Sequence, residues 1–506
     1  MEKIAVVLVE NFSAKLVIAS VVDNNYFVFS DMESEVVNLD LVPDADMFLK
    51  KNQIDGAIKV LKNFRKICEM HQVNSVQAQA IFANNKKPKN VYSFFEEVFN
   101  TCGFRFSILS EEEQNSCIYS GIINSFDIPK GVICHITTQS IHVIFYNRRM
   151  IINQATLPFG SLTLAEMFPL DGGNKQGNLE NMADFVNKKL DEIDFLKEIE
   201  EEYTLVGSGD YYRDLSKMVK KLRKYPLDIE NNYVMEIADC KKVLDQICSI
   251  DIDKTKKIKG VSEARADVFV AAIIINLCVA QKLNRENLVV SVKGIIEGVL
   301  YTHVIESTQE KPISDVLGFS MTGQVMYYDE ENLKHNEQVY NLSMLLFKQL
   351  RVLHKLPRNY TKILRLASFM HDCGARINYS NHAKNGFNVI MGSDICGATH
   401  RELLLAGFAV SLHCGGDIAM SEFIKYKDLI SEEDIGAVKK LGIIIRLAEA
   451  FDRTKNSVIV DINCDILGDS VIMKTIAVGD NSYEIEKAGE CAKDFEKNFG
   501  KKIEIL

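Results

Sequence analysis

The sequence has no CxxC pair and no long hydrophobic run. Its 12 cysteines are scattered over 506 residues. The first apolar run, residues 4–9, is too short for the core of a secretory signal. We therefore expect reduced thiols in a cytoplasmic protein rather than a disulfide framework. The longest apolar run, residues 268–280, is shorter than the roughly 20 residues that a membrane-spanning helix needs, so no membrane partner is expected.

An excess of positive charge is also missing. The formal net charge of -10 argues against non-specific binding of nucleic acid, and a polyanionic substrate would need a local basic patch. Hydrophobic residues make up 47% and charged residues 25% of the chain, which is typical of a globular protein. The length indicates several domains.

Hydrophobic periodicity changes along the chain. Alternating and β-branched segments predict strands at residues 4–9, 15–21, 132–136 and 141–146. Helical spacing predicts helices at 52–70 and 176–201, two more within 262–303, and an almost wholly helical stretch at 331–453. Strands at 458–460, 471–476 and 503–506 around one helix at 484–498 are expected in the tail. No internal repeat is evident, and Pro and Gly within 306–330 indicate a boundary.

The helical stretch contains an ordered set of histidines and acids. It begins with His335, continues with the adjacent pair His371 and Asp372, and ends with His382, His413 and Glu449. This order resembles the ligand set of HD-type phosphohydrolases. Neutral imidazoles and carboxylates suit first-row divalent metals, which can activate water against a phosphorus ester.

Each of these residues has an alternative explanation when it is taken alone. An inward histidine is usually a hydrogen-bonded core residue, and Arg446 at i−3 could partner Glu449. HD-type proteins have a segment with two aspartates at this place in the chain. Glu449 stands at the position of the first aspartate, and Asp452 matches the second. Either acid could be the last ligand, or Asp452 could instead orient another ligand by a hydrogen bond.

Essentially the whole chain also resembles a second kind of phosphatase, and the motifs that carry this resemblance lie within the first 305 residues. Five segments follow the order found in the exopolyphosphatase/guanosine-pentaphosphate phosphatase (Ppx/GppA) family: residues 108–113 with 118–121, 157–160, 205–209, 263–267 and 294–298. The resemblance implies an α/β plus all-α protein. It would have actin/sugar-kinase-like (ribonuclease H-like) domains at 1–125 and 126–305, a helical HD-type domain at 306–455 and a small C-terminal α+β domain at 456–506.

The phosphate loops depart from that family. Its first loop reads DxGSNS, whereas residues 8–13 read LVENFS, so that Leu8 replaces the acidic ligand. Its second loop reads DIGGGSTE, whereas residues 135–142 read HITTQSIH, and Phe82 replaces an arginine. Glycines let backbone amides approach phosphate because they have no Cβ. We therefore expect the cleft between the first two domains to be catalytically weak or redirected.

The resemblances assign roles to individual residues. Glu113 matches the catalytic glutamate, with Glu112 as the alternative register, and His371 and Asp372 would be catalytic at the HD centre. Phosphate or nucleotide contacts are implied for Ser13, Lys15, Ser140, Gly207 and Gly209. Metal ligation is implied for His335, His371, Asp372, His382, His413 and Glu449. The cofactor would be a divalent metal, Mn or Fe at the HD centre and Mg at the interdomain cleft.

Two functions agree with these assignments. The first is a metal-dependent phosphohydrolase of phosphoanhydrides or phosphoesters, such as polyphosphate, guanosine pentaphosphate or a related nucleotide, acting at the HD centre rather than in the cleft. The second is a catalytically inactive protein that senses nucleotide or polyphosphate. Relatives suggest a homodimer.

Overall fold

The computed structural model describes residues 1–23, 25–39, 47–82, 87–170, 175–199, 202–249, 266–305 and 312–506. The chain divides into two compact units, unit 1 at Met1–Ser314 and unit 2 at Asp315–Leu506. Among these described ranges no helix combines the length and the apolar character that crossing a bilayer requires.

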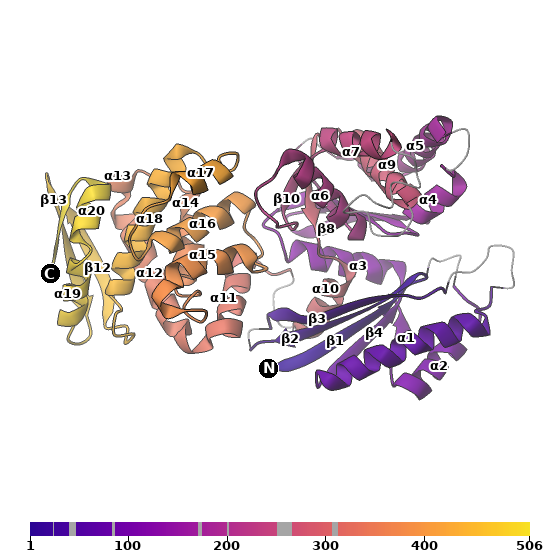
Figure 1. Cartoon of the computed structure of the whole chain (residues 1–506), viewed down its shortest axis with the longest axis horizontal. Coiled ribbons are helices and arrows are strands. Elements are labelled where there is room, and N and C mark those ends of the chain that lie inside the picture. Colours follow the sequence, from indigo (N-terminus) through magenta and orange to yellow (C-terminus); the bar gives the residue numbers. More distant parts are fainter. Residues whose placement is uncertain are drawn as a thin grey trace. The chain divides into compact units, whose positions relative to one another are not determined.

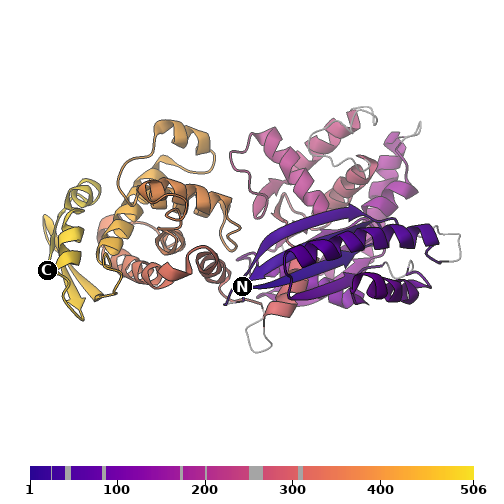
Figure 2. The same cartoon turned by 60° about the horizontal axis from the view of Figure 1, so that its bottom comes forward.

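The first sheet of unit 1 has the strand order β3-β2-β1-β4-β5. Its strands are β1 (Glu2–Val9), β2 (Ser13–Val21), β3 (Phe27–Val36), β4 (Ser75–Ala80) and β5 (Phe106–Ile108). The helices α1 (Lys51–Met70) and α2 (Val91–Cys102) lie along it, and Figures 1 and 2 both show α1 beside the sheet with its axis roughly along the strands. The apolar run in β1 is continuous because this central strand is buried along most of its length.

The second sheet has the order β10-β11-β9-β6-β7-β8. Its strands are β6 (Lys130–Ile136), β7 (Ile141–Asn147), β8 (Met150–Leu157), β9 (Thr204–Ser208), β10 (Tyr233–Glu236) and β11 (Asn287–Ser291). Its helices are α4 (Ser161–Met167), α5 (Lys175–Asp191), α6 (Asp210–Arg223), α7 (Ile237–Ser249) and α9 (Ala266–Lys282), with a 3-10 turn η1 (Asp194–Glu198). The long apolar run forms α9, whose buried residues surround its axis, as in a core helix.

The two sheets share one plan. Three antiparallel strands are followed by parallel ones in β3-β2-β1-β4-β5 and again in β8-β7-β6-β9-β11. The sequence shows no internal repeat, yet the strand order repeats, as the expected two-domain α/β fold requires. The turn between β1 and β2 is consequently equivalent to the turn between β6 and β7.

Two helices lie between the sheets, α3 (Glu111–Ile123) and α10 (Ile295–Val304) (Figure 1). They cross at glycines. A Cβ on Gly298 would lie 2.0 Å from the Cys117 carbonyl oxygen, and one on Gly121 would lie 2.1 Å from the Gly294 carbonyl oxygen. Only glycine permits this approach of the two backbones. The prediction of two helices within 262–303 is confirmed for α9 and α10 but missed β11 between them, and residues 262–265 lie outside the described ranges.

Unit 2 is mostly helical, as the sequence predicted. Its helices are α11 (Val316–Asp329), α12 (Leu333–Gln349), α13 (Arg351–His354), α14 (Tyr360–Phe369), α15 (His382–Gly392), α16 (His400–Leu412), α17 (Met420–Tyr426) and α18 (Glu432–Ala450). Short 3-10 turns lie at η2 (Glu330–Asn332) and η3 (Tyr379–Asn381).

The tail of unit 2 forms a small sheet of β12 (Ile459–Ile466), β13 (Ser470–Ala477) and β14 (Lys502–Ile505) in that order. Two helices pack beside it, α19 (Ser482–Gly489) and α20 (Ala492–Phe499) (Figure 1). The single helix expected at 484–498 is therefore wrong, because the chain bends at Glu490 and Cys491 between the two.

Candidate functional site

All six predicted metal ligands lie at or near helix ends in unit 2. In chain order they are His335 near the start of α12, His371 and Asp372 just beyond α14, His382 at the first residue of α15, His413 just beyond α16 and Glu449 near the end of α18. Three of these helices, α12, α14 and α18, are held by apolar stripes whose members are fully buried. The helical core thus fixes the ends that present the polar side chains.

These side chains converge. Candidate ligand atoms of His335, His371 and Asp372 all lie within 4.8 Å of one another, and so do those of Asp372, His413 and Glu449. The Asp372 carboxylate is 3.8 Å from His371 Nε2 and 3.7 Å from His382 Nε2. The residues that the sequence placed in one set therefore form one cluster.

The orientation of three imidazoles follows one rule. The Nδ1 atoms of His371, His382 and His413 each donate to the backbone carbonyl three residues earlier, that of Ser368, Tyr379 and Val410. A carbonyl oxygen can only accept, so Nδ1 carries a proton, and in the neutral form of each ring the lone pair is at Nε2. All three Nε2 atoms face the cluster. Metal-ligating histidines have this arrangement.

His335 is oriented by a carboxylate instead. Its Nδ1 lies 2.7 Å from Asp452 Oδ2, and both side chains are buried. The other oxygen of Asp452 accepts the Ser457 amide at 2.8 Å. Asp452 is thus occupied with holding His335, which agrees with the second of the roles that the sequence left open for it.

Glu449 does not use the partner that the sequence offered. Arg446 forms its ion pair with Asp494, at 2.5 Å. The Glu449 carboxylate lies 3.6 Å from His413 Nε2 and 3.5 Å from Arg453 Nη1. It is turned towards the cluster.

The charge states inside the cluster favour a cation. Burial lowers the pKa of His371, which keeps the ring neutral, although nearby Asp372 and Glu449 oppose this. Burial opposes ionisation of Asp372, but His371, His413 and the other histidines lower the pKa of its carboxyl. His371 Nε2 is buried without a hydrogen-bond partner among the described residues. A neutral imidazole, an ionised carboxylate and a lone pair without a partner are what metal binding requires.

Sequence reasoning missed Cys414. Its Sγ lies 3.2 Å from His382 Nε2 and 3.4 Å from His413 Nε2. Its place beside His413 was the signal that could have identified it. Gly374 has no positive φ, and its missing Cβ makes room for the His382 carbonyl, 2.1 Å from where that atom would be.

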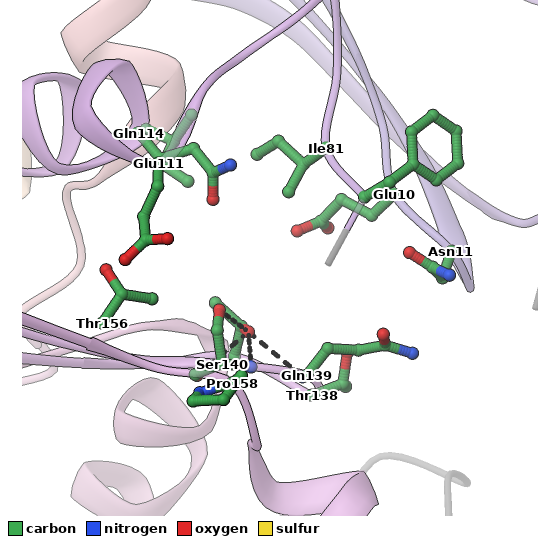
Figure 3. A pocket seen from close by; sticks show the side chains of 13 residues that line it. Glu10, Asn11, Ile81, Glu111, Gln114, Thr138, Gln139, Ser140, Thr156 and Pro158 are labelled. Carbon is green, nitrogen blue, oxygen red and sulfur yellow. Dashed lines mark hydrogen bonds between the residues drawn. The ribbon is translucent and has the colours of Figure 1, made fainter. Parts of the chain in front are cut away.

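Unit 1 contains a recess at the predicted cleft. The turns 10–11 and 137–140 face each other across it, together with the start of α3 and the residues after β8 (Figure 3). Phe82, which takes the place of the arginine, also lines it. The structure therefore brings together the segments that resemble the phosphate loops of the family.

The recess offers an anion little positive charge. The carboxylates of Glu10 and Glu111 point into it (Figure 3). Lys15 bonds Asp210 at 2.6 Å and lies 3.9 Å from Glu10. Burial lowers the pKa of His135 to about 4 and that of His142 to about 3, so both rings are neutral near pH 7.

The predicted residues of this cleft are only partly used there. Ser140 lines the recess. Ser13 instead donates to Glu10 at 3.0 Å. Gly207 packs on the Tyr212 ring, and Gly209 has a φ of 116° with the Ile136 carbonyl 2.4 Å from its missing Cβ. Both glycines therefore have structural reasons to be glycine.

The place of Glu113 differs from the expected one. Its carboxylate accepts the Ser110 amide at 2.7 Å, and the Ser110 hydroxyl accepts the Glu113 amide, which forms a capping box at the start of α3. These backbone and side-chain hydrogen bonds from Ser110 lower the pKa of Glu113. Glu111 lines the recess, whereas Glu113 does not. A catalytic role for Glu113 stays a prediction.

Comparisons with known proteins agree with this architecture. A bifunctional 3-dehydroquinate synthase/phosphatase of Fusobacterium nucleatum is 24% identical over 306 residues, which are 57% of this chain and 45% of that protein. The match therefore spans less than half the length of this relative.

Two solved structures share the fold over part of the chain. A Ppx/GppA family member of Aquifex aeolicus has a TM-score of 0.53 and 23% identity, over 61% of this chain and 99% of its own. An exopolyphosphatase of Cytophaga hutchinsonii has a TM-score of 0.54 and 20% identity, over 60% of this chain and 98% of its own.

Family profiles cover both units. Residues 17–306 match the Ppx/GppA phosphatase family, and residues 328–482 match domain III of the same phosphatases. All six predicted metal ligands lie within the second range. The chain belongs to the Ppx/GppA phosphatase family.

Proposed function

We propose that this family member is a phosphohydrolase of phosphoanhydrides or phosphoesters whose chemistry takes place at the histidine-rich centre of unit 2. One observation carries the proposal. Imidazoles of His371, His382 and His413, each protonated on Nδ1 by its bond to a carbonyl, direct bare Nε2 atoms at Asp372 and Glu449. A helical core without a ligand does not explain such a set, because a buried polar atom normally has a hydrogen-bond partner within the protein.

The donor set fits a first-row divalent metal. Four imidazoles and two carboxylates favour manganese or iron, and the high share of nitrogen disfavours magnesium. His335, His371 and Asp372 would hold one ion, and His382, His413 and Glu449 would complete a second site. When bound, the ion would supply Lewis-acid charge at the phosphoryl oxygen and activate water.

Residues at the edge of the cluster would recognise the substrate. Lys455 Nζ lies 3.9 Å from Asp372 Oδ2, and its side chain is 44% exposed. Arg453 lies beside Glu449 and is 42% exposed. These two cations can bind the oxygens of a terminal phosphate and hold it against the centre. The substrate would be polyphosphate, guanosine pentaphosphate or a related nucleotide.

The test compares the wild-type chain with Asp372→Ala after incubation with manganese or iron. Metal content is measured by elemental analysis, and phosphate release is measured on polyphosphate, guanosine pentaphosphate, simple nucleotides and a generic phosphodiester. We expect one or two transition-metal ions per chain in the wild type. Removing a residue that hydrogen-bonds to a metal ligand lowers activity by roughly 10- to 100-fold. Because Asp372 would be a ligand itself, the rate of phosphate release should fall further than this in Asp372→Ala.

Two outcomes would contradict the proposal. Equal activity of both proteins would show that the centre is not the catalyst. Metal binding without turnover of any of these substrates would favour the alternative of a catalytically inactive protein that senses phosphorylated ligands. Circular dichroism must accompany the assay, because metal binding can contribute to folding.

A further inference from the structure

Cys414 places a sulfur atom in the half of the centre that is nearest to solvent. It directly follows His413 beyond the end of α16 and is exposed, whereas His413 is fully buried. Glycines 415 and 416, with φ of 93° and 105°, then turn the chain away. The backbone thus holds the thiol beside two imidazoles instead of letting it continue along the helix.

The three atoms form a triangle. Cys414 Sγ is 3.2 Å from His382 Nε2 and 3.4 Å from His413 Nε2, and the two nitrogens are 3.1 Å apart. Ligands of tetrahedral zinc lie about 2.0–2.1 Å (nitrogen) and about 2.3 Å (sulfur) from the ion, which puts them roughly 3.3–3.6 Å from one another. The triangle is close to one face of such a tetrahedron.

Hydrogen bonds alone leave this triangle unsatisfied. The Nδ1 protons of both rings go to the carbonyls of Tyr379 and Val410, so two neutral rings would set lone pair against lone pair at 3.1 Å. The thiol has one proton and can donate it to only one of the two nitrogens. A single cation coordinated by all three atoms satisfies them together.

We propose that Cys414 is a thiolate ligand of a soft-metal site with His382 and His413, beside a harder site formed by His335, His371 and Asp372. This inference rests on the metal centre proposed above and makes its two halves unequal. A nitrogen- and sulfur-containing set selects zinc or ferrous iron over magnesium and manganese. Asp372 lies 3.7 Å from His382 Nε2, so its carboxylate is near both sites.

Cobalt(II) is the probe, because a cobalt–thiolate bond gives a charge-transfer absorption in the near ultraviolet that nitrogen and oxygen ligands do not give. The full-length chain is stripped of metal and titrated with cobalt. We expect the band in the wild type and its loss in Cys414→Ser. Removing a residue that only hydrogen-bonds to a metal ligand lowers metal affinity by roughly 10-fold or more. Cys414→Ser removes a ligand itself, so the affinity for the second cobalt ion should fall by more than that.

Matched variants separate the sites. Cys373→Ser is the control thiol, because Cys373 adjoins Asp372 but its Sγ faces the Gly386 carbonyl at 3.7 Å; it should keep the band. His382→Ala should lose the band, and His335→Ala should keep it. Because His382 belongs to the triangle and His335 does not, this pair tests the same site if Cys414→Ser folds poorly.

The outcomes distinguish this inference from the proposed function. Cobalt binding by the wild type without the band, or a band that persists in Cys414→Ser, would overturn the thiolate ligand while leaving the metal centre in place. A wild type that binds no cobalt, zinc or iron would overturn both.

Discussion

Asp452 Oδ2 accepts a hydrogen bond from His335 Nδ1 across 2.7 Å, and the two residues are 1% and 5% exposed. This pair links the end of α18 to the start of α12. It fixes the tautomer of His335 and turns Nε2 towards the cluster. A carboxylate in this position also makes the imidazole a stronger ligand.

The first prediction concerns this pair. Asp452→Asn should weaken metal binding and phosphate release by about 10- to 100-fold, because the neutral amide no longer strengthens His335 as a ligand. Chelator competition and phosphate release measure the two effects. Asp465→Asn is the control, since Asp465 is an exposed carboxylate paired with Lys474. Unchanged metal affinity in Asp452→Asn would mean that His335 is not a ligand.

The second prediction concerns the recess of unit 1. Glu111→Ala and Glu113→Ala should each leave phosphate release from polyphosphate unchanged. The recess lacks the glycines and the arginine of the family, and losing even one oriented charge-stabilising group typically lowers a rate by about 10²–10³. Polyphosphate hydrolysis that disappears in either variant but survives Asp372→Ala would place the chemistry in unit 1.

The third prediction concerns pH. Burial lowers the pKa of His142 from 6.5 to about 3. Between these values the unfolded chain binds the proton and the folded chain does not, so folded stability is present above about pH 6.5 and is lost as the pH falls towards 3. His142→Gln removes this titration while keeping an N–H donor for Asn115, which His142 contacts at 2.7 Å.

Urea unfolding at several pH values measures the slope of stability with pH. The slope on the acid side should be smaller in His142→Gln than in the wild type. Replacement of the exposed His303 by glutamine serves as the control. An identical slope in wild type and His142→Gln would show that this buried ring does not determine the acid sensitivity.

The fourth prediction concerns the crossing of α3 and α10. Gly298→Ala should lower the free energy of unfolding of unit 1, because the new methyl group would meet the Cys117 carbonyl. The expected loss is about 1–3 kcal/mol, the usual penalty of overpacking. Gly56→Ala on the exposed side of α1 has nothing within 4 Å and should stabilise by about 0.5–1 kcal/mol. Thermal unfolding compares them, and a neutral Gly298→Ala would contradict the crossing.

Local patterns predicted much of the fold. The β1–β2 and β6–β7 hairpins, α1 and the helical character of unit 2 follow from periodicity within short windows. The repeated strand order was not visible, because β4, β9 and β11 take their places through parallel pairing between segments far apart in the chain. Such pairing leaves no periodic signal in the sequence.

The site was predictable to a similar degree. Six residues were identified because their order resembles the ligand set of HD-type phosphohydrolases, and the structure brings their side chains into one cluster. Cys414 was missed because its neighbour His382 lies 32 positions away and enters through another helix. Ser110 and Glu113 do form a recognisable S-x-x-E capping box, and this signal could have separated Glu113 from Glu111.

The three bonds from imidazole Nδ1 to carbonyls have a consequence for the thermodynamics of metal uptake. Each bond fixes a ring to the helix turn that precedes it, so folding itself removes the rotational freedom of His371, His382 and His413. An arriving ion therefore meets ligands whose conformational entropy is already low. Its affinity is determined largely by the exchange of hydration water for fixed nitrogen and oxygen donors, and by how stably the surrounding helices are folded.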